Sequence, residues 1–250
     1  VTHGDRASKT MLDQLPYVEF DNIDDYEKPI LPVLITKGCY WGKCTFCDYI
    51  LMGDLGQSRY HIRSVDIVLD EIKALRKMYP HSEVSLISDA VPPKFYKDLC
   101  YKASLDNFKL LSHSYMINNK ALNEEFFQLA QKAHIQKIVF GTESTIDRVL
   151  RLMRKQATRR DILNNFNMAK KYNVPIKVNL IPDYPTTTYD EALKTVRDVW
   201  LFRDIITNIT AFRFYLSADT EMDVSPENFD INVNNDAPYY SPDHNGYHSK

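Results

Sequence analysis

The chain has 250 residues, 44% of them hydrophobic and 12% aromatic, which is enough for one large domain or two small ones with a substantial core. Lysine and arginine number 31 against 33 aspartate and glutamate, so the net charge of -2 gives no general attraction to nucleic acid or to an anionic membrane. Apolar runs such as 30–35 and 178–181 are far shorter than the roughly 20 residues of a membrane span, so we expect a soluble protein without membrane partners.

The compartment is inferred from the start of the chain and from its cysteines. No basic and apolar leader opens the sequence, so secretion has no support and a reducing cytoplasm is expected. In that compartment four cysteines are expected to be thiols or metal ligands rather than disulfides.

Residues 1–29 are polar and turn-rich, with an acidic stretch over 21–27, which predicts a linker or lead-in. From residue 30 onward, short runs of branched apolar residues alternate with segments of helical period. The runs predict strands near 31–36, 83–88, 109–115, 137–142, 175–181 and 208–214. The segments between them predict helices at 64–79, 92–105, 123–134, 145–153, 158–172 and 188–203.

This alternation over 30–215 is typical of an α/β fold in which parallel strands are joined by right-handed helical crossovers. Six units predict a partial, TIM-like (β/α)6 barrel with its site at the carboxyl ends of the strands. An open doubly wound sheet is the competing architecture. Residues 216–250 are rich in Asn, Asp, Pro and Tyr, and we expect them to form either a substrate cover or a partly disordered tail.

Three of the four cysteines, Cys39, Cys44 and Cys47, lie within nine residues in the loop after the first predicted strand. Three thiolates can bind three irons of a [4Fe-4S] cluster and leave the fourth iron open to an exogenous ligand. A structural zinc site normally uses four protein ligands, and the nearest further candidates, His61 and Cys100, are not at a customary spacing. Zinc is therefore the alternative, and Cys100 is interpreted as a core residue of a predicted helix.

The segment from Cys39 to Cys47 resembles the signature of radical S-adenosylmethionine (SAM) enzymes, in which an aromatic residue, here Phe46, precedes the third cysteine. The first gap has four residues where the family has three, which implies a bulged loop at Trp41-Gly42. Residues 140–144, Phe-Gly-Thr-Glu-Ser, resemble the family's Gly-x-Glu-Ser segment. The resemblance covers about 29–215 and implies a barrel of the radical SAM type, close to the cobalamin-binding and peptide-maturation branches.

The resemblance also implies contacts to SAM. It places Phe46 against the adenine, Asp89 on the amino group of the methionine moiety, Lys155 on its carboxylate, Asn179 on the ribose hydroxyls and Glu143 at the catalytic rim. Each position also has an interpretation without SAM. Phe46 would be an aromatic residue packed on the loop, Asp89 a helix N-cap and Lys155 a solvated helix end. Asn179 would make a structural hydrogen bond, and Glu143 would be only an acid at the rim.

Substrate contacts are expected at the same mouth. His113 and Ser114 stand at the end of the third predicted strand, and Arg213 and Tyr215 stand on the sixth. The alternative for a lone His or Tyr is a satisfied core side chain.

The resemblance implies that an electron donor of the flavodoxin or ferredoxin type reduces the cluster, which cleaves SAM to a 5'-deoxyadenosyl radical. The radical would modify an unknown substrate, for which the cysteine loop favours a peptide, by methylation or another C–H functionalisation. Cobalamin would come from a domain outside this chain. The alternatives are an interaction module whose cysteines hold zinc or a cluster without SAM chemistry, and a degenerate barrel that only binds a partner.

Overall fold

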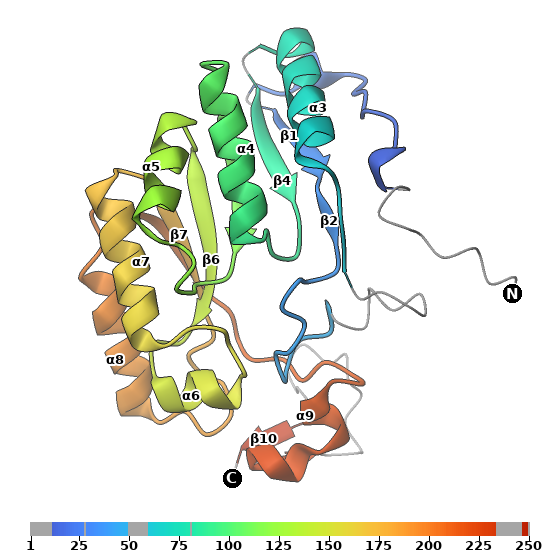
Figure 1. The fold of residues 1–250 in the computed structure, drawn as a ribbon. Helices are drawn as coiled ribbons and strands as arrows, with labels where there is room; N and C mark the ends of the chain where they lie inside the picture. Colours follow the sequence, from blue (N-terminus) through green and yellow to red (C-terminus); the bar gives the residue numbers. More distant parts are fainter. Residues whose placement is uncertain (1–11, 28, 50–59, 81, 234–246, 250) are drawn as a thin grey trace, which may run out of the picture.

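A computed structural model describes residues 12–27, 29–49, 60–80, 82–233 and 247–249. Its centre is a six-stranded parallel sheet in the order β1-β4-β5-β6-β7-β8 (Figure 1). The strands are β1 Ile30–Leu34, β4 Glu83–Ile87, β5 Ser112–Met116, β6 Lys137–Glu143, β7 Ile176–Leu180 and β8 Ile206–Ala211. Because β1 and β8 lie at opposite edges, the sheet is the open form of the predicted barrel, and the predicted α/β class is confirmed.

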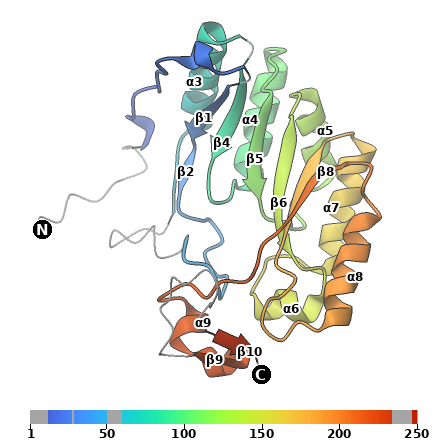
Figure 2. The same ribbon diagram turned by 180° about the vertical axis from the view of Figure 1, so that it is seen from behind.

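Helices cover one face of this sheet. They are α3 Val65–Met78, α4 Pro93–Leu105, α5 Glu124–Lys132, α7 Arg159–Lys171 and α8 Tyr189–Trp200. The short α6, Asp147–Leu152, lies instead at the carboxyl end of the sheet. Figure 2, seen from behind, has the strands in front of these helices, so the second face of the sheet carries no helix in the described part of the chain.

The core lies between the sheet and its helices. Alternate strand residues point to the helices, and those on β1, β4 and β7, such as Leu31, Leu86 and Val178, have no exposed surface. Each such aliphatic side chain stabilises the fold by about 1.5–3 kcal/mol when fully buried. Cys100 on α4 belongs to this core, as predicted from the sequence.

Two predicted strands have different bounds in the structure. The third begins at Ser112 rather than at residue 109, because Leu111 has a φ of 45° and interrupts the extended backbone. The sixth ends at Ala211, which pairs with Leu180, the last residue of β7, so no partner strand remains beyond it. The prediction that Arg213 and Tyr215 lie on this strand is therefore wrong.

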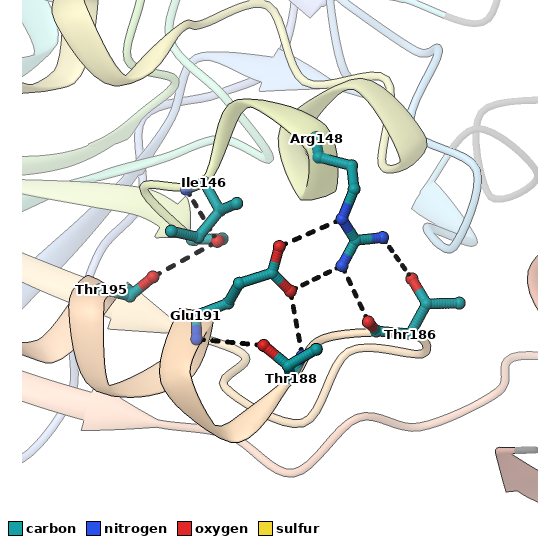
Figure 3. Close-up of polar contacts among 7 residues, drawn as sticks. Ile146, Arg148, Thr186, Thr188, Glu191 and Thr195 are labelled. Atoms are coloured by element: carbon teal, nitrogen blue, oxygen red, sulfur yellow. Dashed lines mark hydrogen bonds and ion pairs between the residues drawn. The ribbon is translucent and has the colours of Figure 1, made fainter.

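An ion pair joins α6 to the start of α8 (Figure 3). Arg148 donates to both carboxylate oxygens of Glu191, at 3.1 and 2.6 Å, and to the hydroxyl and carbonyl oxygens of Thr186, each at 2.8 Å. Glu191 also accepts from the backbone N–H of Thr188 at 3.0 Å, which completes a capping box at the α8 N-terminus. These contacts hold the segment after β6 against the segment after β7.

Residues 216–233 are folded. They form α9 Glu221–Val224, the 3-10 helix η2 Pro226–Phe229 and β9 Ile231–Val233, which pairs with β10 Tyr247–Ser249. Met222, Phe229 and Ile231 are buried with residues of α6 and of the segments after β7 and β8 in a second apolar cluster. We call residues 216–233 the cap. The cap is thus a folded part of the predicted tail, and its role as a substrate cover stays a prediction.

Two small elements complete the described chain. The strands β2 Thr36–Lys37 and β3 His61–Ile62 form an antiparallel pair, and the 3-10 helix η1 spans Ile23–Asp25. Over the described ranges, no helix combines the length and the apolar character needed to cross a bilayer.

Candidate functional site

The cysteine loop leaves β2 at the carboxyl end of the sheet, and its three cysteines are unpaired and half-buried. Gly38 and Gly42 have φ values of 78° and 56°, a left-handed backbone that glycine adopts without strain. The indole Nε1 of Trp41 donates to the carbonyl oxygen of Arg154 at 2.8 Å. The insertion at Trp41-Gly42 is thus a left-handed turn fixed to the residues after α6.

Thr45 holds the centre of this loop. Its N–H donates to the carbonyl of Met153 at 3.2 Å, and its hydroxyl donates to the carbonyl of Leu152 at 3.0 Å. The same hydroxyl lies 3.1 Å from the hydroxyl of Tyr184, which follows β7. Its carbonyl accepts from the N–H of Met222 in the cap at 3.2 Å. Three segments distant in sequence therefore fix the loop between Cys44 and Cys47.

Burial raises the pKa of two of the cysteine thiols. The pKa of Cys44 is raised, and that of Cys47 is raised to about 12, where the backbone N–H of Tyr49 opposes the shift. A bound metal would remove these protons, because thiolate is the form that coordinates iron. The described residues contain no group of three His, Cys, Asp or Glu placed around one metal ion.

A buried ion pair lies beside the loop. The ammonium of Lys155 donates to Oε1 of Glu143 and to the carbonyl of Gly141, both at 3.0 Å. Burial by itself lowers the pKa of Lys155, but Glu143 and the thiols of Cys44 and Cys47 raise it, and the net pKa is raised. Lys155 is therefore a buried cation between a carboxylate and the cysteines, so the interpretation as a solvated helix end is wrong.

The backbone at the end of β6 is shaped for this pair. Glu143 has a φ of 62°, and the register of β6 against β7 shifts between Gly141 and Glu143. A Cβ at position 141 would meet Oε1 of Glu143 at 2.8 Å, so glycine leaves the space that the carboxylate occupies. A left-handed non-glycine residue costs on the order of 1–3 kcal/mol and persists only where the surrounding structure imposes it.

Phe46 reaches the same place from the loop. The centroid of its ring lies 5.7 Å from the ammonium of Lys155 and 5.8 Å from the ring of Tyr184, which it meets edge-on. Phe46 thus has the packing contact of the plainer interpretation and also stands beside the buried cation.

Asp89 lies next to the cysteine loop. Burial raises the pKa of Asp89, and a hydrogen bond from the backbone N–H of Gly38 opposes this shift. The pKa of Tyr49 is raised by burial first and then by the charge of Asp89. The N-cap of α4 is Pro92, so the interpretation of Asp89 as a helix cap is wrong.

Asn179 points to the helix-free face of the sheet. It pairs in register with Gly141 on one side and Thr210 on the other, while its neighbours Val178 and Leu180 are buried against the helices. Its Oδ1 is buried and accepts no hydrogen bond from the described residues. Such an orphaned acceptor fits a ligand that brings a donor, such as a ribose hydroxyl.

The predicted substrate residues are not brought together. Ser114 is buried on the helix side of β5, near Tyr96 of α4. His113 lies on the helix-free face, but in the amino-terminal half of the strand. Burial lowers its pKa, the charge of Lys137 lowers it further, and the charge of Glu83 raises it. The prediction that these two residues end their strand was wrong because β5 runs on to Met116.

Arg213 and Tyr215 leave the sheet. They flank Phe214, whose N–H donates to Asp183 at 2.8 Å and whose side chain packs in the second apolar cluster. Both side chains are exposed. A substrate contact by either residue stays a prediction.

Sequence reasoning missed Thr45, Tyr184 and Tyr49. Thr45 stands inside the cysteine motif, but nothing in a local pattern shows that its hydroxyl meets α6 and the segment after β7. Tyr49, two residues after the last cysteine, was within reach of a local argument, because a loop that binds a ligand commonly continues its contacts past the motif.

These residues fit the group that the cysteine loop suggests. Three thiols on one loop match three irons of a [4Fe-4S] cluster. An orphaned acceptor, a carboxylate and a buried ammonium around them match the ribose, the amino group and the carboxylate of SAM.

Comparison with known proteins gives three findings. A family model described as the radical SAM superfamily matches residues 33–199. The ribosomal protein uS12 methylthiotransferase RimO of Clostridioides difficile (strain 630) is 25% identical over 214 residues, which cover 80% of this chain and 46% of that protein. The third finding is that solved structures share the fold, and two of them are described next.

The radical SAM methyltransferase TsrM from Kitasatospora setae, with cobalamin and a [4Fe-4S] cluster bound, aligns with a TM-score of 0.71 at 16% identity, over 87% of this chain and 42% of that one. The cobalamin-dependent SAM radical enzyme OxsB, with aqua-cobalamin and SAM bound, aligns with a TM-score of 0.62 at 14% identity, over 88% and 38%. The chain thus spans less than half the length of these relatives.

Proposed function

The chain belongs to the radical SAM superfamily, and from this premise we propose that Cys39, Cys44 and Cys47 hold a [4Fe-4S] cluster for the reductive cleavage of SAM. When bound, the cluster and SAM supply the chemistry, a 5'-deoxyadenosyl radical that takes hydrogen from the substrate. The observation that carries the proposal is the buried Lys155–Glu143 pair beside the cysteine loop, a charged site with no role in the main core.

The residues of this chain bind and orient the two groups. The three thiolates each take one iron and leave the fourth open. Lys155 offers an ammonium to the carboxylate of SAM, and Asp89 accepts hydrogen bonds from its amino group. Phe46 packs against the adenine, and the orphaned Oδ1 of Asn179 accepts from the ribose. Glu143 keeps Lys155 in place through their 3.0 Å contact.

Water is kept from the site by the cap. Tyr184 and Phe214 meet edge-on at 5.3 Å and pack with the cap residues Met222 and Phe229 directly behind Phe46. An apolar wall on this side reduces the access of solvent to the bound groups.

For the reaction outcome we propose methylation or another C–H functionalisation of a peptide. The relatives support this: RimO is a methylthiotransferase of a ribosomal protein, and TsrM is a methyltransferase. Cobalamin would bind in a domain outside this chain, since TsrM and OxsB bind it and are more than twice as long as the matched part. A flavodoxin- or ferredoxin-type protein would supply the electron.

The test is anaerobic reconstitution with iron and sulfide, followed by dithionite, SAM and chromatography for 5'-deoxyadenosine. We expect about four irons per chain and product from the wild type and from Cys100→Ala, whose thiol lies in the core, and neither from Cys44→Ala. Zinc retained in place of iron would support the interaction module. A loaded cluster without product from SAM would contradict the proposed cleavage.

A further inference from the structure

The helix-free face of the sheet carries a continuous row of side chains. Tyr115 pairs with Val139, Val139 with Lys177, and Lys177 with Asn208, so one residue from each of β5, β6, β7 and β8 lies in this row. Paired residues of parallel strands point to the same face. Ile87, which follows Leu86 on β4, precedes Tyr115 across the sheet, because Leu86 pairs with Ser114.

At one end of this row the side chains are apolar and exposed. Ile87 is 42% exposed and Tyr115 46%, whereas Leu86, their neighbour on the opposite face, is fully buried. Ile87 is the last residue of β4, two positions before Asp89, the proposed contact of the SAM amino group. The apolar end of the row therefore lies next to the proposed radical site.

Lys177, two strands from Tyr115 in the same row, is a cation without a paired counter-charge. Its side chain is half-buried on β7 and makes no hydrogen bond or ion pair within the described ranges. The other charged and titratable groups that share its face of the sheet are Lys137 on β6, His113 and Tyr115 on β5, and Glu83 on β4. Only Glu83 is a carboxylate, and it lies three strands away. The carboxylate of Glu143, at the end of β6, is already paired with Lys155.

We propose that Lys177 binds an anionic group of the substrate while an apolar or aromatic part of the same molecule packs on Tyr115 and Ile87. The inference rests on the proposed function and names the part of the peptide substrate that this face would hold, an anionic group with an apolar or aromatic group close to it. Adjacent strands are about 4.8 Å apart, so the backbones of Tyr115 and Lys177, two strands apart, are separated by about 10 Å.

The position of Lys177 also suits the chemistry. Asn179, the proposed ribose contact, is two residues farther along β7, a rise of about 6.6 Å. A molecule held by Lys177 would lie below the adenosyl group, within the same face. The charge at Lys177 gives orientation, since an ammonium that loses its water needs an anion as partner.

The test is isothermal titration of the cluster-loaded protein with four probes: 3-phenylpropionate, its neutral amide, phenyl phosphate and acetate. We expect 3-phenylpropionate to bind about tenfold tighter than the amide and than acetate. Lys177→Met should abolish the preference over the amide, Lys177→Arg should retain most of it, and Lys194→Met, on the exposed side of α8, should leave it unchanged. Tighter binding of phenyl phosphate than of the carboxylate would identify the anion as a phosphate.

Equal binding of 3-phenylpropionate and its amide, no binding of either, or a preference that survives in Lys177→Met would overturn the proposal. Circular dichroism and thermal unfolding of each variant exclude misfolding as the cause. Titration needs no turnover, so the two proposals can fail separately. If the protein forms 5'-deoxyadenosine but shows no preference for 3-phenylpropionate over its amide, only the proposed anion contact of Lys177 is overturned. Protein that shows the preference but forms no 5'-deoxyadenosine overturns only the proposed function.

Discussion

Two buried ion pairs among the described residues differ in their surroundings. Arg63 and Glu71 are 2% and 1% exposed and join the end of β3 to α3, and Arg63 also donates to the carbonyl of Leu34 at 3.0 Å. Lys155 and Glu143 lie beside the cysteines. A buried charge that loses its partner is costly, so each pair allows a prediction at the scale of single residues.

Arg63→Met should lower the free energy of unfolding by about 3–5 kcal/mol, because Glu71 would be left as an uncompensated buried charge. Urea denaturation followed by circular dichroism measures the change. Lys94→Met is the matched control: Lys94 pairs with Asp98 but is 85% exposed, so its loss should change the free energy by less than about 1 kcal/mol. Equal effects of the two substitutions would contradict the argument from burial.

Lys155→Ala should weaken SAM binding by about tenfold or more while the iron content of the cluster stays that of the wild type, because the ammonium is proposed to pair with the SAM carboxylate. Equilibrium dialysis with labelled SAM measures the affinity. The double variant Lys155→Met with Glu143→Gln removes both buried charges and should regain stability without regaining affinity. Recovered SAM affinity in the double variant would show that Lys155 acts only through the fold.

At the scale of elements, the hydrogen bonds of the capping box and of Arg148 meet at one carboxylate. The hydrogen bonds from Arg148 are the largest influence on the pKa of Glu191, and they lower it. Arg148 of α6 therefore stabilises the ionised carboxylate of Glu191 in the first turn of α8. A group with a depressed pKa in the folded state contributes stability above its unfolded pKa and loses that contribution as the pH falls.

Glu191→Gln should therefore destabilise the protein at neutral pH and have a smaller effect once the pH falls below about 4.3, the ordinary value of a glutamate. Because the pair is partly exposed, we expect at most about 1 kcal/mol at neutral pH. Urea denaturation of Glu191→Gln, Arg148→Met and the double variant at both pH values gives the coupling energy. A coupling energy that does not change with pH would contradict the assigned role of the carboxylate.

At the scale of the whole molecule, the cap connects the second apolar cluster with the cysteine loop. The N–H of Met222 bonds to the carbonyl of Thr45, and Arg154 forms an ion pair with Glu221 at the start of α9. Figures 1 and 2 both place α9 beside the loop that follows β2. A less stable cap should therefore release iron from the cysteine loop faster.

Phe229→Ala should loosen the cap, since removing a buried phenylalanine costs about 3–5 kcal/mol. We expect faster loss of iron to a chelator while the main sheet stays folded. Iron release followed with a chromogenic chelator, together with far-ultraviolet circular dichroism, measures both effects. Val224→Ala is the control, because Val224 is 72% exposed in the same cap, and an equal rate of iron release in the two variants would refute the link.

The local pattern of the sequence determined much of this protein. The period of apolar residues fixed the type and order of six strands and six helices, since burial of one face imposes that period on each element. The cysteine spacing marked the candidate cluster loop, and the matched family model bears out the superfamily. A resemblance also led to Lys155 and Glu143, which the fold brings to 3.0 Å from each other.

Only the tertiary structure decided which residues share a face and a rim. Ser114 faces α4, because the face on which a strand residue lies depends on the exact register. The strand β8 ends before Arg213, because a strand ends where its partner strand ends. The contacts of Thr45 with α6, Tyr184 and the cap span 107, 139 and 177 positions of the chain in turn, so no local pattern encodes them. Such contacts depend on where distant segments pack, and packing is a property of the whole fold.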